Sequence, residues 1–214
     1  GLQSALNNLY TYCNKWDLEI NTEKTKIMTF NKTGKTIKKY IFSINNTRLE
    51  NTDSYKYLGI IFKPSGVFTA AVKHLISKAK KATFSIRNIF PQNRLSFIQN
   101  IKLFDACIKP ILLYNSEVWG PEIILHDRKS LDKCLLSFMP ENIHIKFIKY
   151  ILGVNRSAVN MAVLAETGRF PIAIHTIKTI IRYFFHIIQA PDTSLIKRIL
   201  YGKLRTKKYF YKES

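Results

Sequence analysis

The sequence predicts an α+β fold, with a small antiparallel β segment and one helix first and a mostly α-helical part after it. Two observations support this prediction. Alternating apolar residues, typical of half-buried strands, occur before residue 63, whereas apolar residues after Gly66 recur every three or four positions, as in helices. With 214 residues, 46% of them hydrophobic, the chain can form one large domain or two to three small modules.

The first 62 residues are predicted to contain one helix and several short strands. Leu2, Leu6 and Leu9 are spaced as on one helix face, which predicts a helix over residues 2–14. Alternation predicts strands at 27–30, 40–44 and 55–62, with a short edge strand around Leu49. The polar segments "NKTGKT" and "NNTRLENTD" are predicted turns between them.

The rest of the chain is predicted to be helical. Helices are expected at 68–89, 95–107, 127–138, 142–152, 157–166 and 172–188. Ser157 is the expected N-cap of one helix, Gly168 its stop signal and Pro171 a first-turn residue of the next. Pro110 is expected to start or kink the segment "ILLYNSEVW", where Trp119 and Glu117 have a packing role. The predicted core residues of the last third are Phe147, Ile151, Leu164, Ile174, Ile177 and Phe184.

Positive charge is the strongest compositional signal. Thirty-four Lys and Arg against 14 Asp and Glu give a formal net charge of +20, which favours a polyanionic partner, nucleic acid first and an anionic membrane surface second. No acidic residue lies between Asp53 and Asp105. Helical geometry places Lys73, Lys80 and Arg87 nearly in line, suited to following a phosphate backbone. The predicted nucleic-acid contacts are Lys73, Lys78, Lys80, Lys81, Arg87 and Arg94, the alternative being an ordinary solvated basic face.

Signatures of catalysis are missing from the sequence. Phosphoryl transfer with two metal ions needs neighbouring carboxylates, and the chain has no Asp-Asp pair. The five histidines lack zinc-ligand spacing, and no G-x-S-x-G marks a nucleophilic serine. The three cysteines lie far apart, which favours reduced thiols in an intracellular compartment. We therefore expect this chain alone to be inactive and to bind no metal or cofactor.

Four segments, taken in order, resemble the carboxy-terminal half of non-LTR (LINE-type) retrotransposon reverse transcriptases. They are "LNNLYTYCNKWDLEINTEKTKIMTF", "YKYLGIIF", "KPILLYNSEVWG" and "FIKYILGVNRSAVNMAVLAETGRFP". The resemblance implies the end of a polymerase palm with its primer grip at 1–62, a helical thumb at 63–120 and a C-terminal helical connector with a basic tail at 121–214. The catalytic Y/F-x-D-D hairpin and the fingers of such enzymes would precede Gly1, so we expect a fragment.

The same resemblance implies roles for individual residues. Lys24 matches the lysine of the turn after the catalytic hairpin, which approaches nucleotide phosphates and can act as a general acid. Asn21 would cap that turn, and Trp16 and Leu18 would anchor the preceding helix on the sheet. Tyr57, Leu58 and Gly59 match the primer grip, a tight hairpin pressed against the primer end.

The resemblance also implies the partners. They are an RNA template with a DNA primer duplex and the missing palm and fingers of the parent polyprotein, with no membrane partner. Mg²⁺ would serve only the complete enzyme, and the location would be cytoplasmic and nuclear.

Two other interpretations remain open at this stage. The chain could be an independent, non-catalytic RNA- or DNA-binding module, or a membrane-surface protein with basic amphipathic helices. The tail "KRILYGKLRTKKYFYK" mixes cations with aromatic residues, so it could stack on bases or be a frayed basic terminus.

Overall fold

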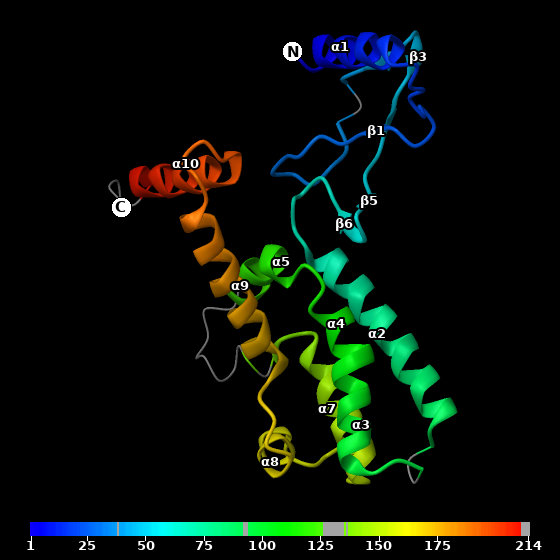
Figure 1. Ribbon diagram of the computed structural model, residues 1–214, viewed down its shortest axis with the longest axis vertical. Helices are drawn as coiled ribbons and strands as arrows, with labels where there is room; N and C mark the ends of the chain where they lie inside the picture. Colours follow the sequence, from blue (N-terminus) through cyan, green and yellow to red (C-terminus); the bar gives the residue numbers. More distant parts are fainter. Residues whose placement is uncertain (38, 92–93, 126–134, 136, 211–214) are drawn as a thin grey trace. The chain divides into compact units, whose positions relative to one another are not determined.

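The computed structural model describes residues 1–37, 39–91, 94–125, 135 and 137–210, and it divides the chain into two compact units (Figure 1). The N-terminal unit is Gly1–Leu75 and the C-terminal unit is Ile76–Ser214, so the division falls inside helix α2 (Thr69–Ile89). Most of the predicted helix at 127–138 lies outside the described residues. No helix in the described parts of the chain is long and apolar enough to cross a membrane.

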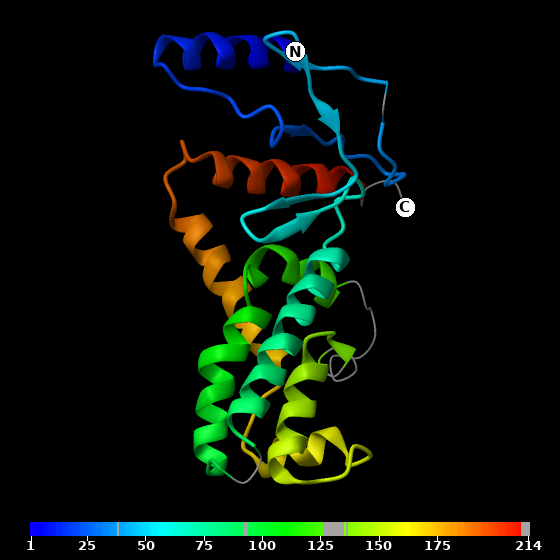
Figure 2. The same cartoon turned by 90° about the vertical axis from the view of Figure 1, so that its right-hand side faces the viewer.

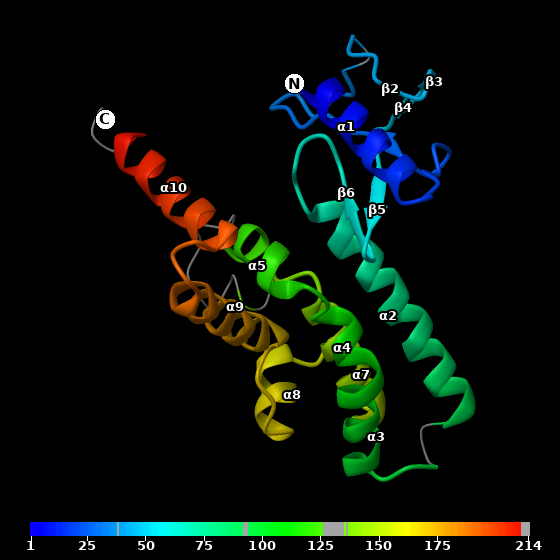
Figure 3. The ribbon, with the colours of Figure 1, turned by 45° about the horizontal axis from the view of Figure 1, so that its top comes forward.

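The N-terminal unit is built on helix α1 (Leu2–Lys15), which packs against strand β2 (Ser43–Ile44), as Figure 3 shows. Leu6, Ile44 and Leu49 form its buried core. Gln3 fixes the contact with two hydrogen bonds to the backbone of Ser43, donating at 2.8 Å and accepting at 3.1 Å. The helix predicted over residues 2–14 is therefore confirmed.

The strands are shorter than predicted and form three separate two-stranded pairs. Strands β2 and β3 (Thr47–Arg48) are antiparallel, as are β5 (Tyr55–Tyr57) and β6 (Ile60–Phe62). Strands β1 (Lys26–Ile27) and β4 (Glu50–Asn51) are parallel, unlike the purely antiparallel segment expected. An ion pair of 2.6 Å between Lys26 and Glu50 joins this parallel pair.

In the C-terminal unit, α3 (Phe97–Leu103) packs against α7 (Glu141–Leu152), and the second half of α2 runs in front of both in Figure 2. Ser96 and Gln99 form a capping box at the start of α3. The chain continues through a π-helix, η1 (Phe104–Ile108), into α4 (Lys109–Leu112). Pro110 stands in the first turn of α4, where a residue without a backbone N–H is tolerated, so its predicted position at the start of an element is confirmed.

Helix α5 (Ser116–Leu125) packs closely on α9 (Ile172–Gln189). A Cβ atom added to Gly120 would lie 2.6 Å from Cγ2 of Thr176, so this approach requires glycine. The neighbouring Trp119 is fully buried, stacks on Phe138 and donates its indole N–H to the Tyr114 carbonyl at 2.8 Å. The predicted packing role of Trp119 is confirmed, whereas Glu117 is only half-buried, in the first turn of α5.

Helix α8 (Asn160–Glu166) begins three residues later than predicted. Ser157 is not its N-cap, because its N–H and hydroxyl both bond to the Asn155 side-chain oxygen in the preceding turn. Gly168 follows the helix with φ +61°, the left-handed conformation expected of a stop signal. Pro171 stands at the N-cap of α9, one position before the first turn. The last helix is α10 (Leu195–Phe210).

The six residues predicted for the core of the last third differ in how deeply they are buried. Phe147 and Leu164 are buried as expected, and Ile151 and Ile177 are half-buried. Ile174 and Phe184 are 37% and 42% exposed, so their prediction is wrong. Helix α9 instead buries the face that carries Ile172, Ala173, Thr176 and Ile187. The short side chain of Thr176 on that face lies against Gly120 and permits the close approach of α5, which the apolar periodicity of α9 alone does not reveal.

Candidate nucleic-acid interface

The turn that contains Lys24 is held by the side chain of Asn21. Its Oδ1 accepts a hydrogen bond from the Lys24 N–H at 2.9 Å, so the predicted cap is confirmed. The backbone oxygen of Asn21 accepts from the N–H and hydroxyl of Thr25, at 3.0 and 2.8 Å. The turn is thus rigid at its base, and the Lys24 side chain is exposed.

The segment at 55–62 is a hairpin, so the prediction of a single strand is wrong. Leu58 and Gly59 form its two-residue turn with φ of +45° and +83°, the signs required by a type I′ turn. The tight hairpin at Tyr57, Leu58 and Gly59 that the resemblance implied is therefore present. A bulky leucine with positive φ is a strained residue, and this one is 69% exposed at the tip.

These two features lie next to each other in the N-terminal unit. The hydroxyl of Tyr55, in β5, donates to the Lys24 carbonyl at 3.4 Å. The hydrogen bond places the lysine turn beside the base of the hairpin. Trp16 and Leu18 do not anchor α1 on a strand pair as expected: both side chains are more than half exposed.

Helix α2 presents most of the predicted cations to solvent. Lys73, Lys78, Lys80 and Lys81 are exposed, as is Arg94 in the loop before α3. The opposite face buries Val72, Leu75, Ala79 and Thr83, which recur at the three- or four-residue spacing expected of this helix. Among the described residues, no ion pair involves these four lysines.

Arg87 departs from the line predicted for Lys73, Lys80 and Arg87. An α-helix drifts about 20° for each seven-residue step, so Arg87 is turned toward the buried face. Its guanidinium carbon lies 3.9 Å from the centre of the Tyr150 ring, and Nη2 donates to the Lys146 carbonyl at 3.2 Å. Burial lowers the pKa of Arg87 from its ordinary value; the charge of Arg156 also lowers it, while Tyr150 opposes the shift.

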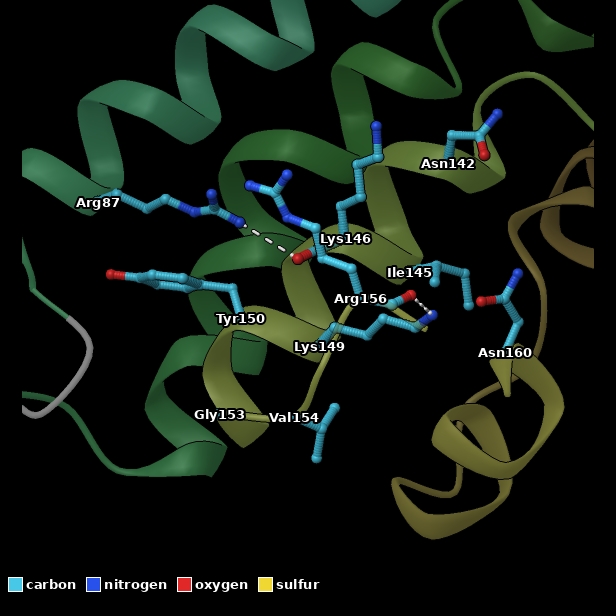
Figure 4. Close-up of a pocket in the computed structure, with 10 residues that line it drawn as sticks. All are labelled: Arg87, Asn142, Ile145, Lys146, Lys149, Tyr150, Gly153, Val154, Arg156 and Asn160. Atoms are coloured by element: carbon cyan, nitrogen blue, oxygen red, sulfur yellow. Dashed lines mark hydrogen bonds between the residues drawn. The ribbon is translucent and has the colours of Figure 1, made fainter. Parts of the chain in front are cut away.

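Arg87 forms one wall of a pocket of about 620 Å³ within the C-terminal unit, shown in Figure 4. Four cationic residues line it: Arg87, Lys146, Lys149 and Arg156. The other lining residues are Asn142, Ile145, Tyr150, Gly153, Val154 and Asn160, and none of the ten is acidic. Sequence reasoning missed this cluster. A signal was present, because no acidic residue lies between Glu141 and Glu166.

The described residues do not fit a Mg²⁺ site. No group of three His, Cys, Asp or Glu side chains among them could hold a metal ion. The nearest approach to a metal-binding spacing in sequence is Asp17 and Glu19, and both side chains are exposed after the end of α1.

Comparison with known proteins identifies relatives among mobile elements. The chain is 29% identical over 123 residues to the RNA-directed DNA polymerase from mobile element jockey of Drosophila melanogaster. It is 27% identical over 120 residues to the jockey polymerase of Drosophila funebris. Each match covers 56% of this chain and 13% of the relative. A putative uncharacterized transposon-derived protein of Caenorhabditis elegans is 30% identical over 124 residues, 58% of this chain and 44% of that protein.

The chain is therefore similar to mobile-element polymerases, and the predicted resemblance to non-LTR retrotransposon reverse transcriptases is confirmed. In particular, the similarity is to the jockey RNA-directed DNA polymerases, of which the matched segment spans about an eighth. No family model matches the chain. No solved structure matches it either.

Proposed function

We propose that this chain is the primer-grip, thumb and connector portion of a retrotransposon reverse transcriptase, without the catalytic Asp pair. Its function is to bind the template–primer duplex of RNA and DNA, inside the cell. The observation that carries the proposal is the face of α2, which exposes cations within a stretch of sequence free of acidic residues. Such a face contacts phosphates without reading sequence.

The exposed face of α2 also holds an aromatic residue between its cations. Phe84 is 66% exposed and follows Lys80 and Lys81 by four and three positions, so all three lie on one side of the helix. Phe84 does not belong to the buried face of α2, so packing of this helix does not account for it. Aromatic surface beside cations is the combination that grips nucleic acid through both phosphates and bases or sugars.

Reversing two charges on α2 is expected to weaken duplex binding strongly. The variant K80E/K81E should lower the affinity of the full chain for an RNA–DNA duplex by about tenfold or more, because phosphate contacts are replaced by repulsion. The plot of log affinity against log salt should become less steep, its negative slope shrinking in magnitude by about 2. Fluorescence anisotropy of a labelled duplex over a salt series measures both quantities.

The matched control for this experiment is K178E/R182E. It changes the net charge equally at exposed positions of α9. If K80E/K81E and the control weaken binding to the same extent, overall charge rather than the α2 face attracts the duplex, and the thumb assignment fails.

The strain at Leu58 supports a functional hairpin tip, because strained residues gather where function requires them. Replacing Leu58 with asparagine, which tolerates positive φ, should stabilise the N-terminal unit by about 1 kcal/mol. The same change should weaken binding to a duplex with a recessed primer end more than binding to a blunt duplex.

Denaturant unfolding and anisotropy with the two duplexes check this prediction. L18N, at an exposed residue outside the positive-φ region, is the control and should not stabilise the unit. Equal affinity of L58N and the unchanged chain for the recessed duplex contradicts a primer-grip role.

Two further assignments belong to the same proposal. Lys24 would face the phosphates of the incoming nucleotide in the complete polymerase, presented by the turn beside the hairpin. The missing palm would cover the outer side of α1, where Leu2, Leu9, Tyr12 and Trp16 form an exposed apolar stripe at helical spacing.

A further inference from the structure

The pocket between the end of α2, one face of α7 and the segment 153–160 has the composition of an anion site. Asn142, Lys146 and Tyr150 follow one another at four-residue spacing on α7, and Arg87 and Arg156 face them from α2 and from the loop (Figure 4). Within the described part of the chain, no ion pair engages Arg87, Lys146 or Arg156. Three cations therefore share a concave surface without a carboxylate to neutralise them.

Like charges have been brought together here at an energetic cost. Figure 4 shows the guanidinium groups of Arg87 and Arg156 directed into the same space next to Lys146. The Nε atom of Arg87 is buried and has no hydrogen-bond partner among the described groups. The repulsion among these crowded cations is relieved by a bound anion.

The backbone that carries Arg156 and the side chain of Arg87 are held in place before any ligand binds. The buried Lys149 donates to the carbonyl oxygens of Arg156 and Ala158, at 2.8 and 2.5 Å, which fixes the loop that carries Arg156. Gly153 ends α7 in the left-handed conformation, with φ +67°. The stacking on Tyr150 and the bond to the Lys146 carbonyl fix Arg87. A preorganised site loses less entropy on binding.

The size of the pocket indicates more than a bare ion. Its volume of about 620 Å³ lies within the range of about 300–1,000 Å³ typical of ligand pockets. Asn142 and Asn160 add amide donors and acceptors, and Ile145 and Val154 add apolar surface. A phosphate together with its sugar and base matches this lining. A flexible single strand can bend into such a concavity, whereas the phosphates of a duplex lie on a stiff rod.

We propose that this pocket binds a phosphate and its attached nucleoside from a single-stranded nucleic acid. This inference rests on the proposed function, since that function makes nucleic acid the ligand, and it adds a single-strand site in the C-terminal unit distinct from the duplex-binding face of α2. Arg156 and Lys146 are the contacts from the loop and from α7, and Arg87 adds the positive charge of its guanidinium group to the pocket wall.

The test uses the full chain and a labelled single-stranded RNA of about ten nucleotides, a length within known single-strand site sizes. The variant K146Q/R156Q is expected to lose about tenfold in affinity, with the salt slope reduced by about 1–2. K178Q/R182Q, which removes two exposed cations from α9, should lose no more than about twofold. The charge-preserving variant K146R/R156K should retain most of the binding, and circular dichroism shows whether each variant is folded.

Two results overturn the proposal. Equal losses in K146Q/R156Q and K178Q/R182Q mean that the chain attracts RNA by its overall charge and not at this pocket. If K146Q/R156Q instead abolishes binding to vesicles of phosphatidylglycerol and phosphatidylcholine while RNA affinity is unchanged, the pocket is a lipid-headgroup site. A failure of this proposal can be told apart from a failure of the proposed function, because the K80E/K81E experiment measures duplex binding while the pocket is unchanged.

Discussion

Replacing Arg169 with methionine is expected to lower the free energy of unfolding of the C-terminal unit by about 3 kcal/mol. Arg169 forms a bidentate pair with Asp105 of η1, with Nη–O distances of 2.6 and 3.1 Å. Its Nε–H donates to Nε2 of His144 in α7 at 3.0 Å. One side chain therefore ties the segment between α8 and α9 to two other elements, and methionine keeps most of its apolar stem while losing every bond.

The bonds of Arg169 continue into the interior. Because His144 accepts through Nε2, its proton is on Nδ1, which donates to Glu141 Oε1 at 2.8 Å. Glu141 is itself buried, and its other oxygen accepts from the N–H of Ile172 at the start of α9, at 2.5 Å. Loss of Arg169 leaves the ring of a buried histidine with an unsatisfied acceptor. The expected value is at the lower end of the range for broken buried pairs, because Asp105 is 39% exposed and can be rehydrated.

The same network predicts a pH dependence. Burial by itself would raise the pKa of Asp105, but the hydrogen bonds and charge of Arg169, with Lys109 and His144, bring this pKa below its ordinary value. A carboxylate with a depressed pKa stabilises the fold above its unfolded-state pKa, about 3.9, and this stability is lost as pH falls through the lower, folded-state value. D105N should therefore be less stable than the unchanged chain near neutral pH, and the difference should shrink below about pH 4.

Urea unfolding followed by circular dichroism, over a pH series, measures both effects. Acid also protonates His175, whose pKa is lowered by burial and by the charges of Lys109 and Arg169. Asp105 opposes this shift, so His175 adds to the difference between the two proteins until Asp105 is itself protonated, below about pH 4. R182M, an exposed arginine of α9 changed in the same way, should cost less than about 0.5 kcal/mol. A loss below about 1 kcal/mol in R169M would show that the network adds little to stability.

Sequence reasoning located most long helices but not these links. Apolar periodicity was sufficient to predict the helices at 2–14, 68–89, 142–152 and 172–188, because each of them has an apolar face that packs against the rest of its unit. It gave no sign that Asp105, His144 and Arg169 meet, since these residues are distant in sequence and belong to different elements. The π-helix that carries Asp105 was likewise unpredicted, because its apolar residues also fit an ordinary α-helix.

The candidate interface was predicted unevenly for similar reasons. The exposed lysines of α2 could be read from charge alone, and the hairpin tip from its resemblance to a known motif. Arg87 was expected in line with Lys73 and Lys80, but the drift over two seven-residue steps is enough to turn it toward the buried face, where it packs on Tyr150. The basic pocket forms because the loop after α7 folds back and brings Arg156 next to that helix. This tertiary contact depends on the left-handed Gly153 at the end of α7 and on the bond from Lys149 to the Arg156 carbonyl, and sequence spacing does not predict it.

Replacing Trp119 with alanine is expected to cost about 3–5 kcal/mol, the range for removing a large aromatic side chain from a core. The indole is fully buried in α5, with its ring centroid 5.9 Å from that of Phe138, and its N–H bond to Tyr114 O closes the turn before the helix. Nearby side chains cannot collapse into the cavity easily, because Gly120 already brings α5 and α9 as close as Thr176 allows.

The chain provides its own control, since its other tryptophan, Trp16, is 60% exposed. W16A should leave the unfolding of the C-terminal unit unchanged, and it makes Trp119 the sole indole, so that fluorescence then reports on that unit alone. Unfolding of W119A is followed by circular dichroism. Equal losses in the two variants would mean that the α5–α9 contact does not determine the stability of the unit that holds both the basic pocket and most of the cationic helix.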